Sequence, residues 1–428
     1  MKKIALALWA SLVVVLAHSQ AVPGKVLQNA SPAANGVSAE RLQRLDALLQ
    51  EYVNKGWMPG AVALVAKDGK IIYHKAIGYH DAEAKKPLQK EAIFRIASQT
   101  KAITSVGVMM LYEEGKILLD DAVSKYIPEF KNPKVLDKYQ EKDSTYTTVP
   151  AKREITIRDL LNHTSGIGYA QIGSPEMNAI YYKAGVVGGI GVDKILLADK
   201  MKILGGLPLF HQPGERWTYG LNTDLSGYLI EVVSGMSLAD FFSKRIFQPL
   251  GMRDTYFYLP AAKHNRLVTL YTEDKDKKML KAASSLPLNG EFYSDYPNSE
   301  GTYFSGGGGL SSTAYDYAVF MQMLLNEGIY NGKRILSPAS VRMMTSNQIG
   351  ELNFGGNYFG LGFEIVAEKN AGESPLSPGS FSWGGMFSSS YWIDPKEKIV
   401  AQLFINQYPH SHGEIHNKFK AVLYGAME

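Results

Sequence analysis

The sequence contains no cysteine. This absence excludes disulfide bonds, a lipid-modified cysteine anchor, a thiol nucleophile and thiolate metal sites. The chain also lacks a strong excess of one charge: its formal net charge is +4 at pH 7, and basic and acidic residues are interspersed, so nucleic-acid binding has no support. No internal repeat or low-complexity segment occurs. With 428 residues, 45% of them hydrophobic and 20% charged, the composition is that of a soluble protein with a large core.

One long apolar run lies at the N-terminus. Lys2 and Lys3 precede it, it covers residues 4–16, and small and polar residues follow through Ala21. This layout is typical of a secretory signal peptide with cleavage just after Ser19. The run is too short to cross a bilayer as a helix, so we expect no membrane span after its removal. The sequence therefore predicts export, to a bacterial periplasm or to the medium.

Apolar spacing predicts strands at both ends of the chain and helices between them. Near the N-terminus, residues 37–56 follow helical spacing, and Asp68-Gly69 is a hairpin signal between strands expected at 61–66 and 70–78. Further strands are expected at 361–366, 380–383, 389–394 and 399–406. Helices are expected at 102–114, 223–234, 237–247, 314–326, from Pro338 onward, and at 414–423.

These patterns predict an α+β fold. We expect an antiparallel sheet built from both chain ends, flanked by helices, with a large and mainly helical insertion. After a signal peptide at residues 1–19, residues 20–428 are expected to form one domain. Its α/β part would comprise residues 37–115 and 304–428, and its helical part residues 116–303.

Ser98-Gln99-Thr100-Lys101 places a hydroxyl and an amine three residues apart at the start of an apolar helix. Residues three apart share one helix face, so the Lys101 amine can reach the Ser98 hydroxyl. A desolvated lysine can remove the proton of a serine and make it a nucleophile. The helix N-terminus adds backbone N–H groups and partial positive charge. The motif is short, and a solvated surface turn is the alternative interpretation of these residues alone.

Tyr219 lies at a junction between a loop and a helix. Its hydroxyl can relay a proton if nearby cations keep its pKa low, whereas a packed core aromatic is the alternative. His163, in a turn rich in hydroxyl groups, is interpreted as structural because Lys101 already supplies a base.

Gly384 and Gly385 follow Trp383 on an expected edge strand. Paired glycines allow a substrate backbone to approach closely, and the next N–H, that of Met386, can point at a developing oxyanion; a β-bulge is the alternative.

Three histidines near the C-terminus, His410, His412 and His416, have a spacing that a metal site can use. No carboxylate pattern accompanies them, and a serine nucleophile needs no metal. We interpret them as a solvated loop and helix start, and we expect no metal and no cofactor.

Taken together, the motifs resemble the serine β-lactamase and penicillin-binding-protein superfamily, in the branch related to class C β-lactamases, carboxylesterases and D-amino-acid peptidases. Members share Ser-x-x-Lys on a helix, a Tyr-x-Asn-type element, and Lys-Thr-Gly, His-x-Gly or Trp-Gly-Gly on a late strand. The similar elements here are Ser98-x-x-Lys101, Tyr219 with its neighbours, and Trp383-Gly384-Gly385. Further landmarks of the branch recur in order at residues 155–166, 247–255 and 307–310, so the resemblance spans nearly the whole mature chain.

The resemblance implies a β-lactamase/transpeptidase-like fold and assigns roles to residues. It implies Ser98 as nucleophile, Lys101 and Tyr219 as its proton acceptors, and the backbone N–H groups of Ser98 and Met386 as an oxyanion hole. It implies substrate-binding positions at Tyr169, Gln171, Asn222, Trp383, Gly384 and Gly385.

Two departures from the β-lactamase pattern bear on the substrate. Leu221 stands two places after Tyr219, where β-lactamases carry an asparagine that is similar to a substrate-amide holder, and Asn222 comes one place later. Trp383 stands where β-lactamases commonly carry a lysine, a cation suited to the carboxylate of a β-lactam or a peptide. Trp-Gly-Gly is more similar to the esterase members.

We therefore predict an exported serine hydrolase, a carboxylesterase that acts on small neutral esters. The alternatives are a β-lactamase or a D-amino-acid peptidase acting on cell-wall peptides, and a non-catalytic protein that binds acyl compounds or peptidoglycan. In each case the partner is a small-molecule ester, a lactam or a D-peptide.

Overall fold

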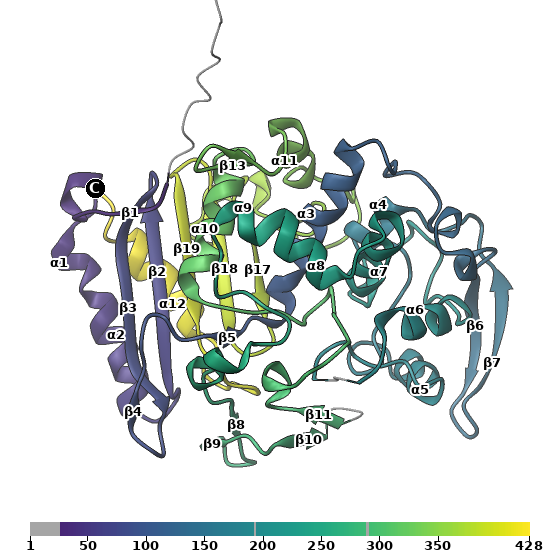
Figure 1. The fold of residues 1–428 in the computed structure, drawn as a ribbon, viewed down its shortest axis with the longest axis horizontal. Helices are drawn as coiled ribbons and strands as arrows, with labels where there is room; N and C mark the ends of the chain where they lie inside the picture. The colour runs from purple at the N-terminus through teal and green to yellow at the C-terminus, as the bar shows by residue number, and fades with distance from the viewer. Residues whose placement is uncertain (1–25, 192–193, 288–290) are drawn as a thin grey trace, which may run out of the picture.

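The computed structural model describes residues 26–191, 194–287 and 291–428, and the predicted signal peptide lies outside these ranges. One side of the molecule is built on a nine-stranded sheet in the order β1-β3-β2-β19-β18-β17-β16-β15, with β4 beside β3, and the helical part lies on the other side (Figure 1). Its strands are β1 (Gln28–Asn29), β2 (Gly60–Lys67), β3 (Lys70–Asp81), β4 (Lys86–Pro87), β15 (Tyr358–Phe359), β16 (Glu364–Ile365), β17 (Phe381–Gly385), β18 (Ser389–Asp394) and β19 (Ile399–Phe404).

The two ends of the chain form one sheet, as the sequence predicted. β2 and β19 pair antiparallel, with Val62 opposite Phe404 and Lys67 opposite Ile399. Neighbouring strands run antiparallel except β1, which is parallel to β3. Successive residues of a strand point to opposite faces, so alternate residues of β2 enter two separate apolar cores.

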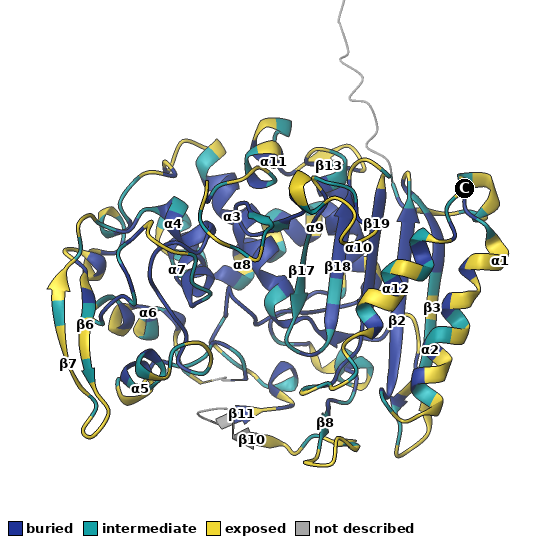
Figure 2. Ribbon diagram, turned by 180° about the vertical axis from the view of Figure 1, so that it is seen from behind, coloured by how far each residue is buried: buried dark blue, intermediate teal, exposed yellow. Residues whose placement is uncertain are grey.

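Helices cover both faces of the sheet. One face carries α1 (Ala39–Leu42), α2 (Arg44–Asn54) and α12 (Ile415–Tyr424), whose inner sides are buried and outer sides exposed (Figure 2). Ser38 caps α1 by accepting a hydrogen bond from the Arg41 N–H, as an N-cap serine does. The other face carries α10 (Ala314–Leu325), α3 (Thr100–Glu113) and the helical part of the chain.

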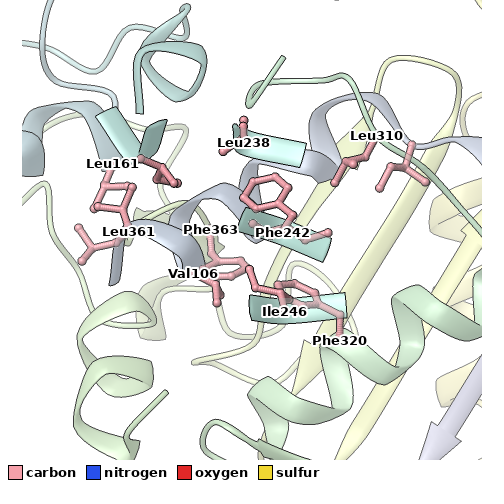
Figure 3. Packing of buried hydrophobic residues seen from close by; sticks show 14 of the residues in the cluster. Val106, Leu161, Leu238, Phe242, Ile246, Leu310, Phe320, Leu361 and Phe363 are labelled. Atoms are coloured by element: carbon pink, nitrogen blue, oxygen red, sulfur yellow. The ribbon is translucent and has the colours of Figure 1, made fainter. Parts of the chain in front are cut away.

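α3 runs through the middle of the protein. Residues 100–111 are all buried, and the helix packs on α7 (Asn222–Ser234) and α8 (Leu238–Phe242). A Cβ at Gly107 would lie 2.9 Å from the Ile230 side chain and 3.3 Å from that of Phe241, so glycine permits this close approach. Val106 lies in the same apolar cluster as Phe242 (Figure 3). A helix buried all round holds its first turn firmly in place.

The helical part also contains strands that the sequence did not predict. Its helices are α4 (Ile157–Leu161), α5 (Pro175–Lys183), α6 (Leu197–Gly205), α7, α8 and α9 (Gln248–Leu250), and a π-helix, Ser243–Phe247, joins α8 to α9. Its hairpin strands are β6 (Lys134–Gln140) with β7 (Thr145–Pro150), β8 (Tyr271–Glu273) with β9 (Met279–Lys281), and β10 (Ser285–Pro287) with β11 (Glu291–Tyr293). The β6–β7 hairpin is largely exposed on both sides, so it lacks the alternating apolar pattern that reveals a half-buried strand.

The remaining elements are short. They are β5 (Phe94–Arg95) paired with β12 (Ser311–Ser312), β13 (Ile329–Tyr330) paired with β14 (Lys333–Arg334), and α11 (Pro338–Met344). The strand expected at 361–366 is reduced to β16, and β15 precedes it. Gly362, with φ of 97°, turns the chain between these two strands, which shortens both.

In the described ranges no single helix combines the length and apolar character needed to cross a membrane. Only α7 taken together with residues 238–250, across a bend of 81°, meets those two criteria.

Candidate active site

Ser98 lies in a single 3-10 turn, Ala97–Gln99, immediately before α3. Ala97 has a φ of 43°, a left-handed conformation that is costly for a residue with a Cβ and is found where surrounding packing enforces it. The end of β17 supplies part of that packing: a Cβ on Gly385 would lie 2.4 Å from the Ile96 carbonyl oxygen. Only glycine therefore allows the strand to lie this close to the turn that presents Ser98.

The Lys101 side chain is buried, with 2% of its surface exposed, and its amine has three oxygen partners. Lys101 Nζ lies 3.2 Å from Ser98 Oγ, 3.0 Å from the Tyr169 hydroxyl and 2.7 Å from the Gly307 carbonyl oxygen. Because Ser98 and Lys101 lie one helical turn apart, the expected contact forms within the chain's local structure.

Tyr219 completes the group around Ser98. Its hydroxyl lies 2.7 Å from Ser98 Oγ, and Lys101 Nζ lies 4.6 Å from the centre of its ring. Burial opposes ionisation of the phenol, but the charge of Lys101 and hydrogen bonds with Lys101 and Ser98 outweigh it and lower the pKa of Tyr219. The predicted proton relay therefore has the cation that it requires.

Tyr169 lies on the other side of Lys101, with its ring centre 5.3 Å from that of Tyr219. Burial, followed by the neighbouring Tyr219 and Asp224, raises the pKa of Tyr169 well above its ordinary value. The two tyrosines differ in chemistry: Tyr169 stays a neutral hydroxyl, while Tyr219 is the more acidic phenol.

Three aromatic rings pack around Tyr219. The ring centres of His163, Trp217 and Trp383 lie 5.2, 6.0 and 5.6 Å from that of Tyr219. His163 is 1% exposed, and burial, then the charge of Lys101, lowers its pKa well below the ordinary value. It remains a neutral ring packed behind Tyr219 and has no hydrogen bond to Ser98, in agreement with its structural interpretation.

A cavity of about 870 Å³ opens beside Ser98. Its lining includes the predicted site residues Ser98, Tyr169, Gln171, Tyr219, Trp383, Gly384, Gly385 and Met386. Met386 directly follows β17, so its backbone N–H lies at the strand end that packs on the Ser98 turn. The cavity thus extends from Ser98 to the late-strand glycines Gly384 and Gly385.

Asn222 does not reach this cavity, contrary to its expected substrate-binding position. It is fully buried in the first turn of α7, where its amide nitrogen lies 3.0 Å from His163 Nδ1 and its oxygen accepts from Ser165. Leu221 is also fully buried. A buried amide needs such partners, and these turn the side chain of Asn222 toward the interior.

Asp224 and Gly307 are site residues that the sequence analysis missed. Asp224, 1% exposed, accepts a hydrogen bond of 2.6 Å from the Ser305 hydroxyl, and Gly307 accepts the hydrogen bond from Lys101. Residues 307–310 formed a family landmark in the sequence, but nothing in their spacing related them to Lys101.

The C-terminal histidines are not simply a solvated loop. His410 Nδ1 lies 2.7 Å from Ser388 Oγ, and His416 Nδ1 lies 2.7 Å from Ser390 Oγ. Burial lowers the pKa of His416 to about 3. Across the described part of the chain, no three histidine, cysteine or acidic side chains come together as metal ligands do.

A serine with an amine and a phenol in hydrogen-bond reach, beside a cavity, defines the class of serine hydrolases that form acyl-enzymes. Comparison with known proteins identifies the family. A family model described as Beta-lactamase matches residues 45–424. The chain belongs to this family, within the serine β-lactamase and penicillin-binding-protein superfamily, and is a serine hydrolase.

Similar proteins include esterases. The chain is 30% identical to esterase EstB of Burkholderia gladioli over 385 residues, 88% of this chain and 93% of that protein. It is 27% identical to a putative D-alanyl-D-alanine carboxypeptidase of Escherichia coli O157:H7 over 425 residues, 94% of this chain and 91% of that protein. The chain is also similar to the solved structure of EstCE1, a hydrolase with promiscuous acyltransferase activity. The two are 28% identical in sequence, with a TM-score of 0.77, and the match covers 90% of this chain and 99% of EstCE1.

Proposed function

We propose that this protein is a carboxylesterase that hydrolyses small neutral esters through an acyl-enzyme on Ser98. The observation that carries the proposal is the placement of Ser98 Oγ 2.7 Å from the Tyr219 hydroxyl and 3.2 Å from Lys101 Nζ, at the wall of the cavity. This geometry supplies a base to a hydroxyl that is otherwise a weak nucleophile.

The reaction proceeds in two steps. Lys101, with Tyr219, takes the proton of Ser98 as Oγ attacks the ester carbonyl, and the oxyanion lies between the backbone N–H groups of Ser98 and Met386. Tyr219 then protonates the leaving alcohol as the bond from the carbonyl carbon to the alcohol oxygen breaks. Water activated by Lys101 and Tyr219 hydrolyses the acyl-enzyme and restores the Ser98 hydroxyl.

The choice of an ester rests on Trp383. Its indole ring is half-buried and packs 5.6 Å from Tyr219 where a β-lactamase commonly presents a lysine. An uncharged indole cannot bind the carboxylate of a β-lactam or of a peptide C-terminus as an ammonium does. The aromatic group around it favours a neutral acyl or alcohol group instead.

A D-amino-acid peptidase or β-lactamase is the second candidate, and one observation favours it. Lys420 of α12 lines the same cavity, so a cation is present there although β17 lacks one. No described feature favours the non-catalytic binder, because a binding protein has no use for a base beside a serine.

A substrate panel on the mature protein tests the proposal. We expect turnover of a short-chain p-nitrophenyl ester to exceed that of a chromogenic cephalosporin and of a D-alanyl-D-alanine peptide. A lactam or peptide preferred by orders of magnitude would establish the second candidate. A fluorophosphonate probe should label Ser98, as peptide mass spectrometry would detect; an unlabelled Ser98 together with no turnover would establish the binder.

We also propose that the protein is exported. The charged start, the apolar run at residues 4–16 and the small residues before Ala21 support this proposal. Expression of the full chain in a Gram-negative host, followed by cell fractionation and N-terminal sequencing, should find a chain that begins at Gln20 outside the cytoplasm. An unprocessed cytoplasmic chain would contradict it.

A further inference from the structure

The segment at residues 305–309 passes beneath Lys101 between α3 and α7. The Thr104 hydroxyl of α3 donates to the Gly306 carbonyl oxygen at 2.7 Å, and a Cβ on Gly306 would lie 2.6 Å from the Thr223 carbonyl oxygen of α7. A Cβ on Gly307 would lie 2.3 Å from Asp224 Oδ2. Side chains are therefore excluded on both sides, and the backbone is held in one position.

Asp224 binds this segment directly. Its Oδ1 accepts from the Ser305 hydroxyl at 2.6 Å, and the Gly307 N–H donates to the carboxylate. The carbonyl oxygen of the same Gly307 accepts from Lys101 Nζ at 2.7 Å, the shortest of the three contacts of that amine. One buried carboxylate thus fixes the residue that holds the amine.

We propose that Asp224 is a positioning residue for the base: it orients Lys101 through Gly307 and stabilises the ammonium that forms when Lys101 takes the Ser98 proton. The inference rests on the proposed function, in which Lys101 is the proton acceptor. In this step the Ser98 O–H bond breaks and an N–H bond forms at Lys101. The electron pair of Ser98 Oγ forms the bond to the acyl carbon, and the carbonyl π pair moves onto the carbonyl oxygen to give the oxyanion. Asp224 remains a carboxylate and receives no proton.

Among the titratable groups around Asp224, Lys101 is the one that can carry a positive charge. The titratable groups that face it are Lys101 of α3, Tyr169 and Tyr303, and burial keeps both phenols neutral by raising their pKa. Burial also raises the pKa of Asp224, whereas the Ser305 hydroxyl, the Lys101 charge and the Gly307 N–H oppose that rise. Its place in the first turn of α7 further favours an anion. Among these neighbours the carboxylate stabilises only the cation on Lys101.

Asp224→Asn tests the inference because it removes the charge and keeps the shape. The matched control is Asp316→Asn: Asp316 is 4% exposed in the first turn of α10 and accepts from the Thr255 hydroxyl and the Asp254 N–H, but it does not line the cavity beside Ser98. The measurement is kcat and KM for p-nitrophenyl butyrate, with thermal unfolding of each variant.

For Asp224→Asn we expect kcat to fall about 10²-fold with KM changed less than about threefold, because the carboxylate acts on the base and not on bound substrate. Asp316→Asn should keep the wild-type kcat and KM.

An equal loss in both Asp→Asn variants, or a loss in Asp224→Asn that comes from a raised KM with kcat unchanged, would overturn the inference. If Asp224→Asn does not fold, Ser305→Ala takes its place: it removes one donor to the carboxylate and should lower kcat several-fold with KM unchanged, whereas wild-type kcat would overturn the inference. Failure of the proposed function is distinguishable, because wild-type protein would then show no Ser98-dependent ester hydrolysis.

Discussion

The two faces of the central sheet bury different kinds of side chains. Beneath α2 and α12 the core is mainly apolar, with Trp392 packed edge-on against Phe419 at 5.8 Å, although Asp394 is fully buried there and accepts a hydrogen bond from the Tyr424 hydroxyl of α12. On the other face, α3 and α7 bury Lys101, Asn222 and Asp224 among apolar neighbours. Buried polar groups cost free energy unless each finds a partner, so the second face is specialised for chemistry and the first for stability.

Removal of the nucleophile should give the largest effect on the polar face. In Ser98→Ala we expect ester hydrolysis to fall at least about 10⁴-fold with little change in Tm, because Ser98 makes the acyl bond but is not a core residue. The control is Ser105→Ala, which removes a buried hydroxyl from the same helix and should retain activity. Wild-type hydrolysis by Ser98→Ala would refute the mechanism.

Loss of the phenol should come next. Tyr219→Phe removes the hydroxyl that lies 2.7 Å from Ser98 Oγ, and we expect kcat/KM to fall by about 10² to 10⁴. Because Tyr219 donates a proton to the leaving alcohol in the proposed mechanism, its ionisation should give the wild-type profile an alkaline limb that is absent from the variant. Tyr181→Phe, which loses a buried hydroxyl bonded to the Pro208 carbonyl oxygen, is the control and should keep the wild-type profile.

A truncation on the apolar face should lower stability and leave activity unchanged. Trp392→Ala leaves a large cavity under α12 and should lower the free energy of unfolding by about 3 to 5 kcal/mol, measured by urea titration. The kcat/KM of the protein that remains folded should stay near wild type. A selective loss of kcat/KM, with unfolding unchanged, would show that the two faces are not separated as described.

The smallest effect concerns the histidine on the apolar face. His416 has a folded-state pKa of about 3 against about 6.5 when unfolded, because it is buried beside His410 and Lys420. The unfolded chain therefore binds the proton first, and stability is full above about pH 6.5 and falls progressively as the pH drops toward 3. Between pH 7 and pH 5 the loss should be about 2 kcal/mol.

His416→Gln, which stays neutral, should lack that portion of the acid destabilisation when urea titrations at pH 7 and pH 5 are compared. His412→Gln is the control from the same segment. An identical acid response in His416→Gln and wild type would show that His416 is protonated in the folded protein.

Features set by neighbours in sequence could be predicted. Asp68-Gly69 marked the β2–β3 hairpin, and both residues have the positive φ that the turn requires, 51° and 75°. Ser98 and Lys101 meet because a helical turn separates them. The β6–β7 hairpin at residues 134–150 escaped prediction because its exposed strands carry no alternating apolar pattern.

Features set by distant segments escaped prediction. Asn222 was expected at the substrate, but contacts with His163 and Ser165 turn it inward. Asp224 and Gly307 showed no sign of their relation to Lys101, because the contact depends on how α3, α7 and the glycine segment pack.

The sequence by itself determined the contact between Ser98 and Lys101, the paired strands at the two ends of the chain and the uncharged residue on the late strand, since periodicity and short spacings encode them. Only the tertiary structure decided which buried carboxylate stands behind the base and which polar residues face the cavity. Such contacts join elements far apart in the chain, and packing, which no local pattern records, brings them together.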